Sequence, residues 1–175
     1  MNERNLYLKQ EWDNREKRLG KTKQAVLFKR FPSWLNESLH RRHIDFIKSN
    51  IPNHAVSILD VGCGYGRIAV EIKSRCPQIS LFQGIDLCTE FATYYSSKIG
   101  PCFNGPVQDF ESEQDYDIIL IVTLLMYLDD TEFLPMIKKL WSILNKSGLV
   151  ICIEPAIEFL NFWQKITRNR NAQPT

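Results

Sequence analysis

The stretch Ile58-Leu59-Asp60-Val61-Gly62-Cys63-Gly64-Tyr65-Gly66-Arg67-Ile68-Ala69 decides how this chain folds. Apolar residues lead into three glycines at alternate positions, and an apolar pattern with helical spacing follows them. The pattern predicts a buried strand, a tight turn and the start of a helix. Glycine lets a ligand lie against the main chain, and free amides at a helix N-terminus point toward whatever covers the turn. A ligand site is therefore expected here, although a turn without a ligand has the same pattern.

Strand-like and helix-like segments alternate after this stretch. Strands are expected at residues 57–61, 80–85, 102–108, 117–122 and 149–153, with helices at 66–74, 90–98 and 130–144. The strand at 102–108 has the weakest pattern, because Gly105 and Pro106 interrupt it. Residues 145–148, Asn-Lys-Ser-Gly, are expected to form a turn. Such alternation produces a parallel sheet with helices on both faces, hence an α/β fold.

The two ends of the chain are expected to be helical. Helices are predicted at residues 3–20 and 34–48, with a short or irregular segment at 24–34 between them. A last helix is predicted from the apolar stripe of Ile157, Leu160, Trp163 and Ile166. We expect one compact unit in which residues 1–50 form a helical cover and residues 51–175 form the ligand-binding domain.

Length and composition fit one globular domain. The chain has 175 residues, of which 44% are hydrophobic and 24% charged. The longest apolar run, residues 118–128, is too short to span a membrane, and the polar start lacks a signal sequence, so we expect a cytoplasmic protein. The five cysteines are scattered, which favours neither a disulfide framework nor a metal site.

The charge is unevenly distributed along the chain. Residues 1–50 contain 12 Lys/Arg and 6 Asp/Glu, whereas the remainder contains 10 and 14. A basic segment of this kind could contact nucleic acid or an acidic substrate. Acidic residues are interleaved with the basic ones, which favours a solvated helix face.

Two acidic residues narrow the choice of ligand. Asp86 follows Gly66 by 20 residues at the end of the next expected strand, where a carboxylate can accept hydrogen bonds from both ribose hydroxyls. Both dinucleotide sites and S-adenosylmethionine sites have this spacing. The third glycine, however, comes one residue earlier than in Gly-x-Gly-x-x-Gly, and Arg67 replaces the small residue of a dinucleotide site. Asp60 would repel a pyrophosphate but attract an ammonium group.

The segment 60–66, Asp-Val-Gly-Cys-Gly-Tyr-Gly, resembles the first motif of class I S-adenosylmethionine-dependent methyltransferases of the small-molecule type. The resemblance extends to residues 84–87, 108–110 and 147–149, and covers roughly residues 56–158. It implies a Rossmann-like, doubly wound, mainly parallel sheet of about five strands in the order 3-2-1-4-5, with N-terminal helices. We expect no counterpart of the family's sixth and seventh strands in this sequence.

The resemblance also implies a set of cofactor-binding residues. Asp60 and the loop would lie along the methionine part and the adenosine, Asp86 at the ribose, Leu87 beside the adenine, and Thr123 near the methionine. The residues matching the loop at the adenine edge and face are Gln108, Asp109 and Phe110, although Asp109 could simply cap a turn. The implied loop residues are Gly62, Cys63, Gly64 and Gly66. The cofactor would be S-adenosylmethionine, with S-adenosylhomocysteine as product.

Methyl transfer from S-adenosylmethionine needs few catalytic groups, because the sulfonium already activates the methyl group. Glu154, Tyr127 and His40 are candidates for a base or hydrogen-bonding partner, without a motif that selects one. Aromatic side chains favour a sulfonium, and the candidates for such a wall are Trp12, Trp34, Tyr65 and Tyr127. Arg41 or Arg42 could contact the methionine carboxylate, or could simply lie on the surface.

The acceptor is less well defined. No Asn/Asp-Pro-Pro-Tyr motif follows residue 122, which disfavours amino-methylation of DNA or glutamine. We therefore predict methyl transfer to an O, N or C atom of a small metabolite. The alternatives are a cofactor-binding module without turnover of its own, or an RNA methyltransferase. The apolar strand 149–153 would be an exposed sheet edge, so we expect the last helix, a homodimer partner or the remainder of a longer chain to cover it.

Overall fold

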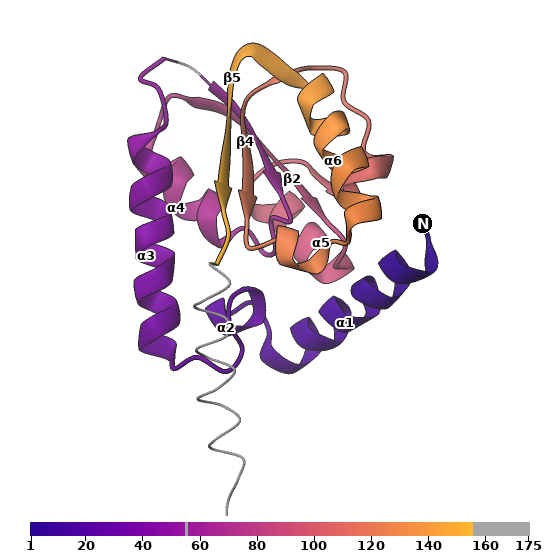
Figure 1. Cartoon of the computed structure of the whole chain (residues 1–175). Coiled ribbons are helices and arrows are strands. Elements are labelled where there is room, and N and C mark those ends of the chain that lie inside the picture. Colours follow the sequence, from indigo (N-terminus) through magenta and orange to yellow (C-terminus); the bar gives the residue numbers. More distant parts are fainter. Residues whose placement is uncertain (55, 156–175) are drawn as a thin grey trace, which may run out of the picture.

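The glycine-containing stretch folds as the sequence predicts. In this computed structural model, which describes residues 1–54 and 56–155, β1 (Val56–Val61) leads through the glycine turn into α4 (Arg67–Arg75). The chain continues through β2 (Ile79–Asp86), α5 (Thr89–Lys98), β3 (Cys102–Asn104), η1 (Val107–Asp109), β4 (Tyr116–Val122), η2 (Leu125–Tyr127), α6 (Asp130–Ser142) and β5 (Leu144–Ile153). The helices α1 (Glu3–Leu19), α2 (Lys23–Val26) and α3 (Ser33–Ser49) precede β1 (Figure 1).

The sheet has five strands in the order β3-β2-β1-β4-β5, and every pair of neighbours is parallel. This confirms the predicted α/β, Rossmann-like topology. Asp60 of β1 lies between Gly84 of β2 and Leu120 of β4 in the register. Because the strands are parallel, the carboxyl ends of β1, β2 and β4 meet at one edge of the sheet, where ligands bind in such folds.

Helices cover both faces of the sheet. One core cluster contains residues of α3, α4 and α5 packed on one face, including Ile44, Ile72 and Tyr95. The second cluster lies on the other face, where Met136 and Leu140 of α6 pack against the strands and η1. Strand β4 is buried at six of its seven positions, which explains its continuous apolar sequence.

The N-terminal helices occupy two different places. The helices α1 and α2 lie below the carboxyl ends of the strands in Figure 1, whereas α3 stands beside α4. The side chain of Asn2 caps α1 by accepting a hydrogen bond from the amide of Asn5 at 2.8 Å. At the other end of α1, Gly20 has a φ angle of +62°, which glycine adopts without strain.

Three predicted boundaries were wrong. The strand predicted at 102–108 ends at Asn104, because Pro106 has no amide hydrogen for the ladder and the chain turns into η1. The turn predicted at 145–148 belongs to β5, at an irregularity where the register shifts between Tyr116 and Ile118. Helix α6 ends at Ser142, two residues before its predicted end.

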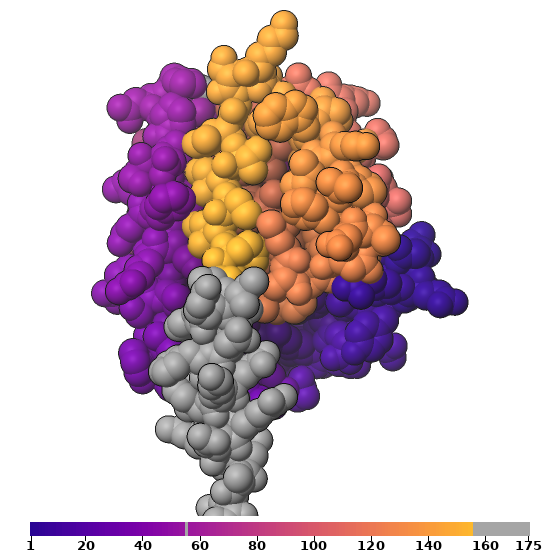
Figure 2. All heavy atoms as spheres, in the orientation of Figure 1, coloured from indigo at the N-terminus to yellow at the C-terminus, as the bar shows by residue number. Residues whose placement is uncertain are grey.

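Strand β5 forms one edge of the sheet within the described residues. Figure 2 shows it at the surface between α3 and α6, and the side chains of Leu149 and Val150 are exposed. The predicted helix over residues 157–166 lies outside the described residues. The expected absence of a sixth and seventh strand also concerns that part of the chain and stays a prediction.

No helix among the described residues is long and apolar enough to cross a membrane.

Candidate functional site

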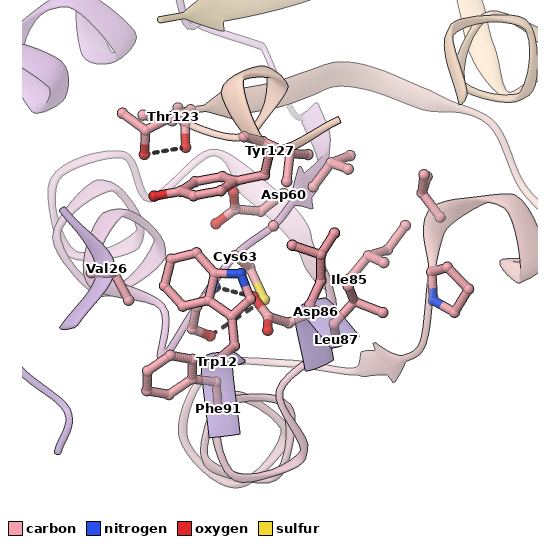
Figure 3. A pocket seen from close by; sticks show the side chains of 18 of the residues that line it. Trp12, Val26, Asp60, Cys63, Ile85, Asp86, Leu87, Phe91, Thr123 and Tyr127 are labelled. Atoms are coloured by element: carbon pink, nitrogen blue, oxygen red, sulfur yellow. Dashed lines mark hydrogen bonds between the residues drawn. The ribbon is translucent and has the colours of Figure 1, made fainter. Parts of the chain in front are cut away.

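A cavity opens at the carboxyl edge of the sheet, below the ends of β1, β2 and β4. Its walls come from the glycine turn, from the segments that follow β2 and β4, and from α1 and α2 (Figure 3). The side chains of Trp12, Val26, Asp86 and Tyr127 all line it. Segments far apart in the sequence therefore form one chamber at the place where this fold binds ligands.

The glycine turn presents bare backbone to this cavity. Gly62, Gly64 and Gly66 have φ angles of +72°, +55° and +85°, in the left-handed region that favours glycine. The amides of Gly62 and Cys63 both donate hydrogen bonds to the carbonyl oxygen of Ile85, at 2.8 Å and 3.1 Å. These bonds fix the turn against the end of β2 and leave its surface open to a ligand.

Asp86 is partly buried and is held by two backbone amides. Its Oδ2 accepts a hydrogen bond from the amide of Gly64 at 2.7 Å, and its Oδ1 accepts one from the amide of Cys88 at 2.8 Å. Burial raises the pKa of Asp86 to about 6, against the opposing effect of these amides. The carboxylate thus has a fixed orientation and retains lone pairs for a further donor.

Asp60 differs from Asp86, because its Oδ2 atom is buried without a hydrogen-bond partner. The residue lines the same cavity. Burial raises the pKa of Asp60 to about 7, while the charge of Arg67 lowers it and that of Asp86 raises it further. A buried acceptor without a donor is costly, so this oxygen is suited to a donor brought by a ligand.

Arg67 is a cavity residue for which sequence analysis proposed no ligand role. It is the first residue of α4, is buried, and lines the cavity. Its NH1 atom lies 3.1 Å from Nδ1 of His40, and its NH2 atom lies 3.4 Å from Nδ1 of His43. The sequence feature that could have indicated a role for Arg67 is its position immediately after the third glycine.

The segment after β4 contains a residue with strained backbone, Thr123, and is held by the carboxylate of Glu154. Thr123 has a φ angle of 56°, an unusual value for a β-branched residue. The Oε1 atom of Glu154 accepts hydrogen bonds from the amides of Leu124 and Leu125, at 2.7 Å and 2.9 Å. Glu154 therefore holds the backbone that carries Thr123 and η2, and strained backbone of this kind often occurs at functional sites.

Most of the predicted cofactor-binding residues lie along the cavity, namely Asp60, Gly62, Cys63, Gly64, Asp86, Leu87, Gln108 and Thr123. The other three do not line it. Gly66 packs against Tyr95, Phe110 is buried against Phe103 in the core, and Asp109 lines a separate polar pocket beside η1.

The three catalytic candidates occupy different places. Tyr127 lines the cavity, and its ring packs edge-on against Trp12 with centroids 5.2 Å apart. Glu154 is not among the cavity-lining residues, and its Oε1 already binds two amides. His40 is buried behind Arg67, with its Nε2 atom 2.7 Å from Oε1 of Glu71.

Of the other aromatic candidates, Trp12 lines the cavity, whereas Trp34 is exposed and Tyr65 packs beside Phe91 and Tyr94. The Arg15 guanidinium lies 4.8 Å from the Trp12 ring centroid. Arg41 and Arg42 are exposed and do not line the cavity. Asn5, Leu8 and Val26 also line the cavity but were not among the predicted site residues, because nothing in their local sequence indicates a distant partner.

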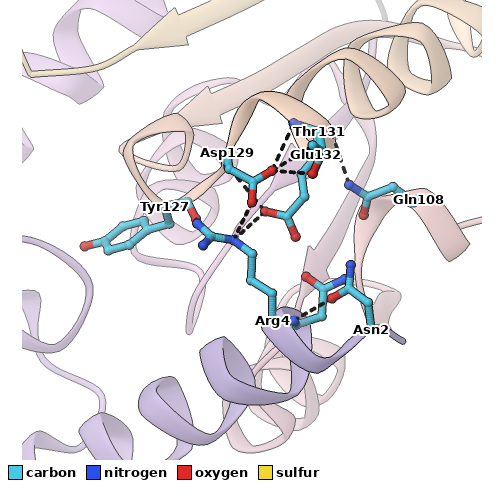
Figure 4. Close-up of polar contacts among 8 residues, drawn as sticks. Asn2, Arg4, Gln108, Tyr127, Asp129, Thr131 and Glu132 are labelled. Atoms are coloured by element: carbon cyan, nitrogen blue, oxygen red, sulfur yellow. Dashed lines mark hydrogen bonds and ion pairs between the residues drawn. The ribbon is translucent and has the colours of Figure 1, made fainter.

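Polar contacts of Arg4 with Asp129, Glu132 and Tyr127, called the Arg4 latch below, join α1 to the start of α6. Figure 4 shows Arg4 reaching the start of α6, where its Nε atom lies 2.8 Å from Oε2 of Glu132 and 3.3 Å from Oδ2 of Asp129. Its NH2 atom donates to the carbonyl oxygen of Tyr127 at 2.9 Å. The same Glu132 completes the capping box of α6 with Asp129. Helix α1, which supplies Trp12, is thereby tied to the segment that supplies Tyr127.

The described residues contain no group of three or more His, Cys, Asp or Glu side chains arranged to hold a metal ion.

Comparison with known proteins identifies the family. The family described as "Methyltransferase domain" matches residues 58–148, more than half of the chain. A curated relative, the ubiquinone biosynthesis O-methyltransferase of Rickettsia prowazekii (strain Madrid E), is 28% identical over 89 residues, which are 49% of this chain and 35% of that protein. The chain thus spans about a third of the length of the relative it matches.

Solved structures share the fold. Magnesium protoporphyrin IX methyltransferase from Synechocystis PCC 6803, with bound S-adenosylhomocysteine, has a TM-score of 0.65 at 13% identity over 95% of this chain and 80% of that one. Phosphoethanolamine N-methyltransferase 1 of Haemonchus contortus has a TM-score of 0.69 at 17% identity over 89% of this chain and 33% of that one. With the glycine turn, the sheet order and the matched family together, the chain belongs to the methyltransferase domain family.

Proposed function

We propose that this chain binds S-adenosylmethionine and transfers its methyl group to an O, N or C atom of a small metabolite, releasing S-adenosylhomocysteine. The observation that carries the proposal is the unpartnered Oδ2 atom of Asp60, which lines a cavity beside the glycine turn and Asp86. The family match, and neighbours of the same fold solved with S-adenosylmethionine or S-adenosylhomocysteine, support it.

The lining residues fit this cofactor part by part. Asp60 offers its free acceptor to the ammonium group, and Asp86 offers its remaining lone pairs to the ribose hydroxyls. Leu87 and Gln108 line the part of the cavity assigned to the adenine, and Thr123 the part assigned to the methionine. A side chain on Gly62 would reach within 3.0 Å of Leu124, so the glycine keeps this surface free for a ligand.

The bound cofactor would supply a methyl group already activated by the sulfonium. The chain's task is then to align the acceptor, and positioning of this kind contributes about 7–11 kcal/mol to catalysis. Trp12 and Tyr127 form an aromatic wall, and an aromatic face near a cation contributes roughly 0.5–2 kcal/mol. Of the three catalytic candidates, Tyr127 is the one placed to meet an acceptor in the cavity.

The position of α1 favours a small acceptor over RNA. Its residues Asn5, Leu8 and Trp12 line the cavity, and Arg4 ties the helix to α6. A chamber covered in this way admits a small molecule more readily than a folded nucleic acid. We accordingly propose that residues 1–50 include the cover and that residues 51–175 form the cofactor-binding domain, although α3 also contributes Ile44 and Ile47 to the core.

Titration calorimetry with S-adenosylmethionine and S-adenosylhomocysteine tests the cofactor. We expect Asp86→Asn to weaken binding at least about 10-fold, because a charged acceptor for the ribose is lost. Asp115→Asn is the matched control, since Asp115 is exposed and does not line the cavity. Absence of binding to the unaltered chain, or equal affinity of the Asp86 variant, would overturn the proposal.

Turnover is tested separately, with methyl-labelled cofactor and a panel of small metabolites. Label in a metabolite would remove the alternative that the chain is a cofactor-binding module without turnover, and label in RNA would favour the RNA enzyme. We also propose that a homodimer partner or the remainder of a longer chain covers the edge of β5, which sedimentation checks. A cytoplasmic location is proposed as well, in keeping with the five free cysteines.

A further inference from the structure

Two side chains of opposite charge line the cavity without forming an ion pair. Asp60 and Arg67 are both buried and both face the chamber. Each charge acts on the other, because Arg67 lowers the pKa of Asp60 while Asp60 raises that of Arg67. No carboxylate in the described part of the chain, Asp60 included, lies within 4.0 Å of the Arg67 nitrogens.

Neutral groups hold the Arg67 guanidinium instead. An arginine only donates hydrogen bonds, so the Nδ1 atoms of His40 and His43, at 3.1 Å and 3.4 Å, act as acceptors. His40 then carries its hydrogen on Nε2 and donates it to Oε1 of Glu71 at 2.7 Å. Burial lowers the pKa of both rings, that of His43 to about 4, which keeps them neutral at pH 7. These contacts orient the guanidinium without pairing it to a carboxylate.

The cavity contains no substitute for this cation. Arg67 is the one basic side chain among the residues that line it, within the described chain. Of the two lining carboxylates, Asp86 has both oxygens on backbone amides, whereas Asp60 keeps a free oxygen. A ligand that binds both the free oxygen of Asp60 and the unpaired charge of Arg67 must carry a cation and an anion close together.

We propose that Arg67 binds the carboxylate and Asp60 the ammonium of an α-amino-acid group on the ligand, with His40 as a positioning residue that orients Arg67. The inference rests on the proposed function, in which that group is the methionine end of the cofactor. It assigns the carboxylate to the first residue of α4, directly after the glycine turn, rather than to the exposed Arg41 or Arg42. The site thereby selects against adenosyl compounds that lack the amino-acid group.

A binding experiment with three ligands distinguishes the contribution of the ligand's carboxylate from that of its ammonium group. S-adenosylhomocysteine has the ammonium and the carboxylate, decarboxylated S-adenosylmethionine has the ammonium alone, and 5′-methylthioadenosine has neither. We expect Arg67→Met to weaken binding of the first roughly 10- to 100-fold. Binding of the other two should change less than about threefold, because they make no bond to Arg67. Arg41→Met is the control for loss of a surface charge.

The comparison among the three ligands distinguishes a specific loss of binding from misfolding of the variant. An Arg67→Met protein that still binds 5′-methylthioadenosine is folded at the site, and Arg67→Lys provides a second variant that keeps the charge. Equal losses for all three ligands, or no loss for S-adenosylhomocysteine, would overturn the role of Arg67. Failure of the unaltered chain to bind any of them would overturn the proposed function itself.

The role of His40 has its own readout. His40→Leu removes the acceptor at Nδ1, whereas His40→Asn places an amide oxygen near the same position. We expect the leucine variant to lose several-fold of the preference for S-adenosylhomocysteine over 5′-methylthioadenosine, and the asparagine variant to regain part of it. A purely structural role would lower both affinities together and leave their ratio unchanged, and that result would remove His40 from the proposal.

Discussion

Val26 of α2 packs directly on Gly64 of the glycine turn, where a Cβ atom on the glycine would lie 2.8 Å from Cγ1 of Val26. Gly64 also has a φ angle of +55°. Two independent costs therefore oppose any side chain at this position, namely backbone strain and a clash with the N-terminal cover.

Substitution of Gly64 by alanine separates these costs. We expect Gly64→Ala to lower the free energy of unfolding by about 2–4 kcal/mol, from left-handed strain of about 1–2 kcal/mol plus the clash. Gly20→Ala is the matched control, because Gly20 has a similar φ of +62° but nothing within 4 Å of its Cβ position. Val26→Ala should restore the steric part alone. Urea unfolding of the four single and double variants checks this, and additive losses would contradict direct packing.

Glu154 offers a second test, because it holds backbone rather than lining the cavity. Its Oε1 accepts hydrogen bonds from the amides of Leu124 and Leu125. We expect Glu154→Ala to destabilise the protein by about 1–3 kcal/mol, since two amides lose their acceptor, and Glu154→Gln to cost less, since an acceptor remains. Thermal unfolding and cofactor binding measure both effects. If glutamine abolishes methyl transfer while stability and binding are unchanged, Glu154 acts as a base instead.

The Arg4 latch predicts a local effect on α1. Arg4→Met removes the pairing with Glu132 and Asp129 and the bond to the Tyr127 carbonyl. Because Arg4 is partly exposed, the pairs contribute no more than about 1 kcal/mol each, and amide exchange in α1 should accelerate about two- to fivefold. Lys17→Met is the control, as Lys17 is exposed and near the other end of α1. Unchanged exchange in α1 would mean that apolar contacts such as Trp12 fix the helix without the latch.

The sequence predicted the sheet well because its signals are local. The apolar run of β4 and the glycines after β1 each determine their own backbone, and parallel order follows from the alternation of strands and helices. The same holds for Asp86, whose distance from Gly66 follows from the length of one helix and one strand.

The roles that the sequence left open depend on contacts across the chain, including those of residues it had named as candidates, such as Trp12 and Glu154. Arg67 matters because His40, 27 positions earlier, holds it without cancelling its charge. Trp12 lines the cavity because Tyr127 meets it from the other end of the sequence. Glu154 was a candidate base, but its carboxylate accepts hydrogen bonds from amides 29 and 30 positions earlier. Composition and periodicity do not contain such pairings, since each depends on where two distant elements meet.

The free oxygen of Asp60 gives the last prediction, which needs no ligand. Burial raises the pKa of Asp60 from 3.8 to about 7 in the folded protein. A raised carboxyl pKa means that the folded state holds the proton more tightly than the unfolded state. The stability contributed by the protonated form is therefore present below about pH 4 and is lost as the pH rises toward 7.

Asp60→Asn removes this titration and replaces the charge by a neutral amide of the same shape. We expect the free energy of unfolding of the variant to rise by about 1–3 kcal/mol relative to that of the unaltered chain when the pH is raised from 5 to 8, because the penalty of ionising a buried carboxyl disappears. Urea unfolding at both pH values measures the difference, with Asp115→Asn as the exposed control. Asp86 is present in both proteins, and its charge is one of the causes that raise the pKa of Asp60. A gain independent of pH would show that Asp60 has an ordinary pKa in the folded chain. A gain at pH 8 accompanied by weaker cofactor binding would mean that the ligand relieves the cost of this buried charge, which explains why a destabilising carboxylate occupies the centre of the site.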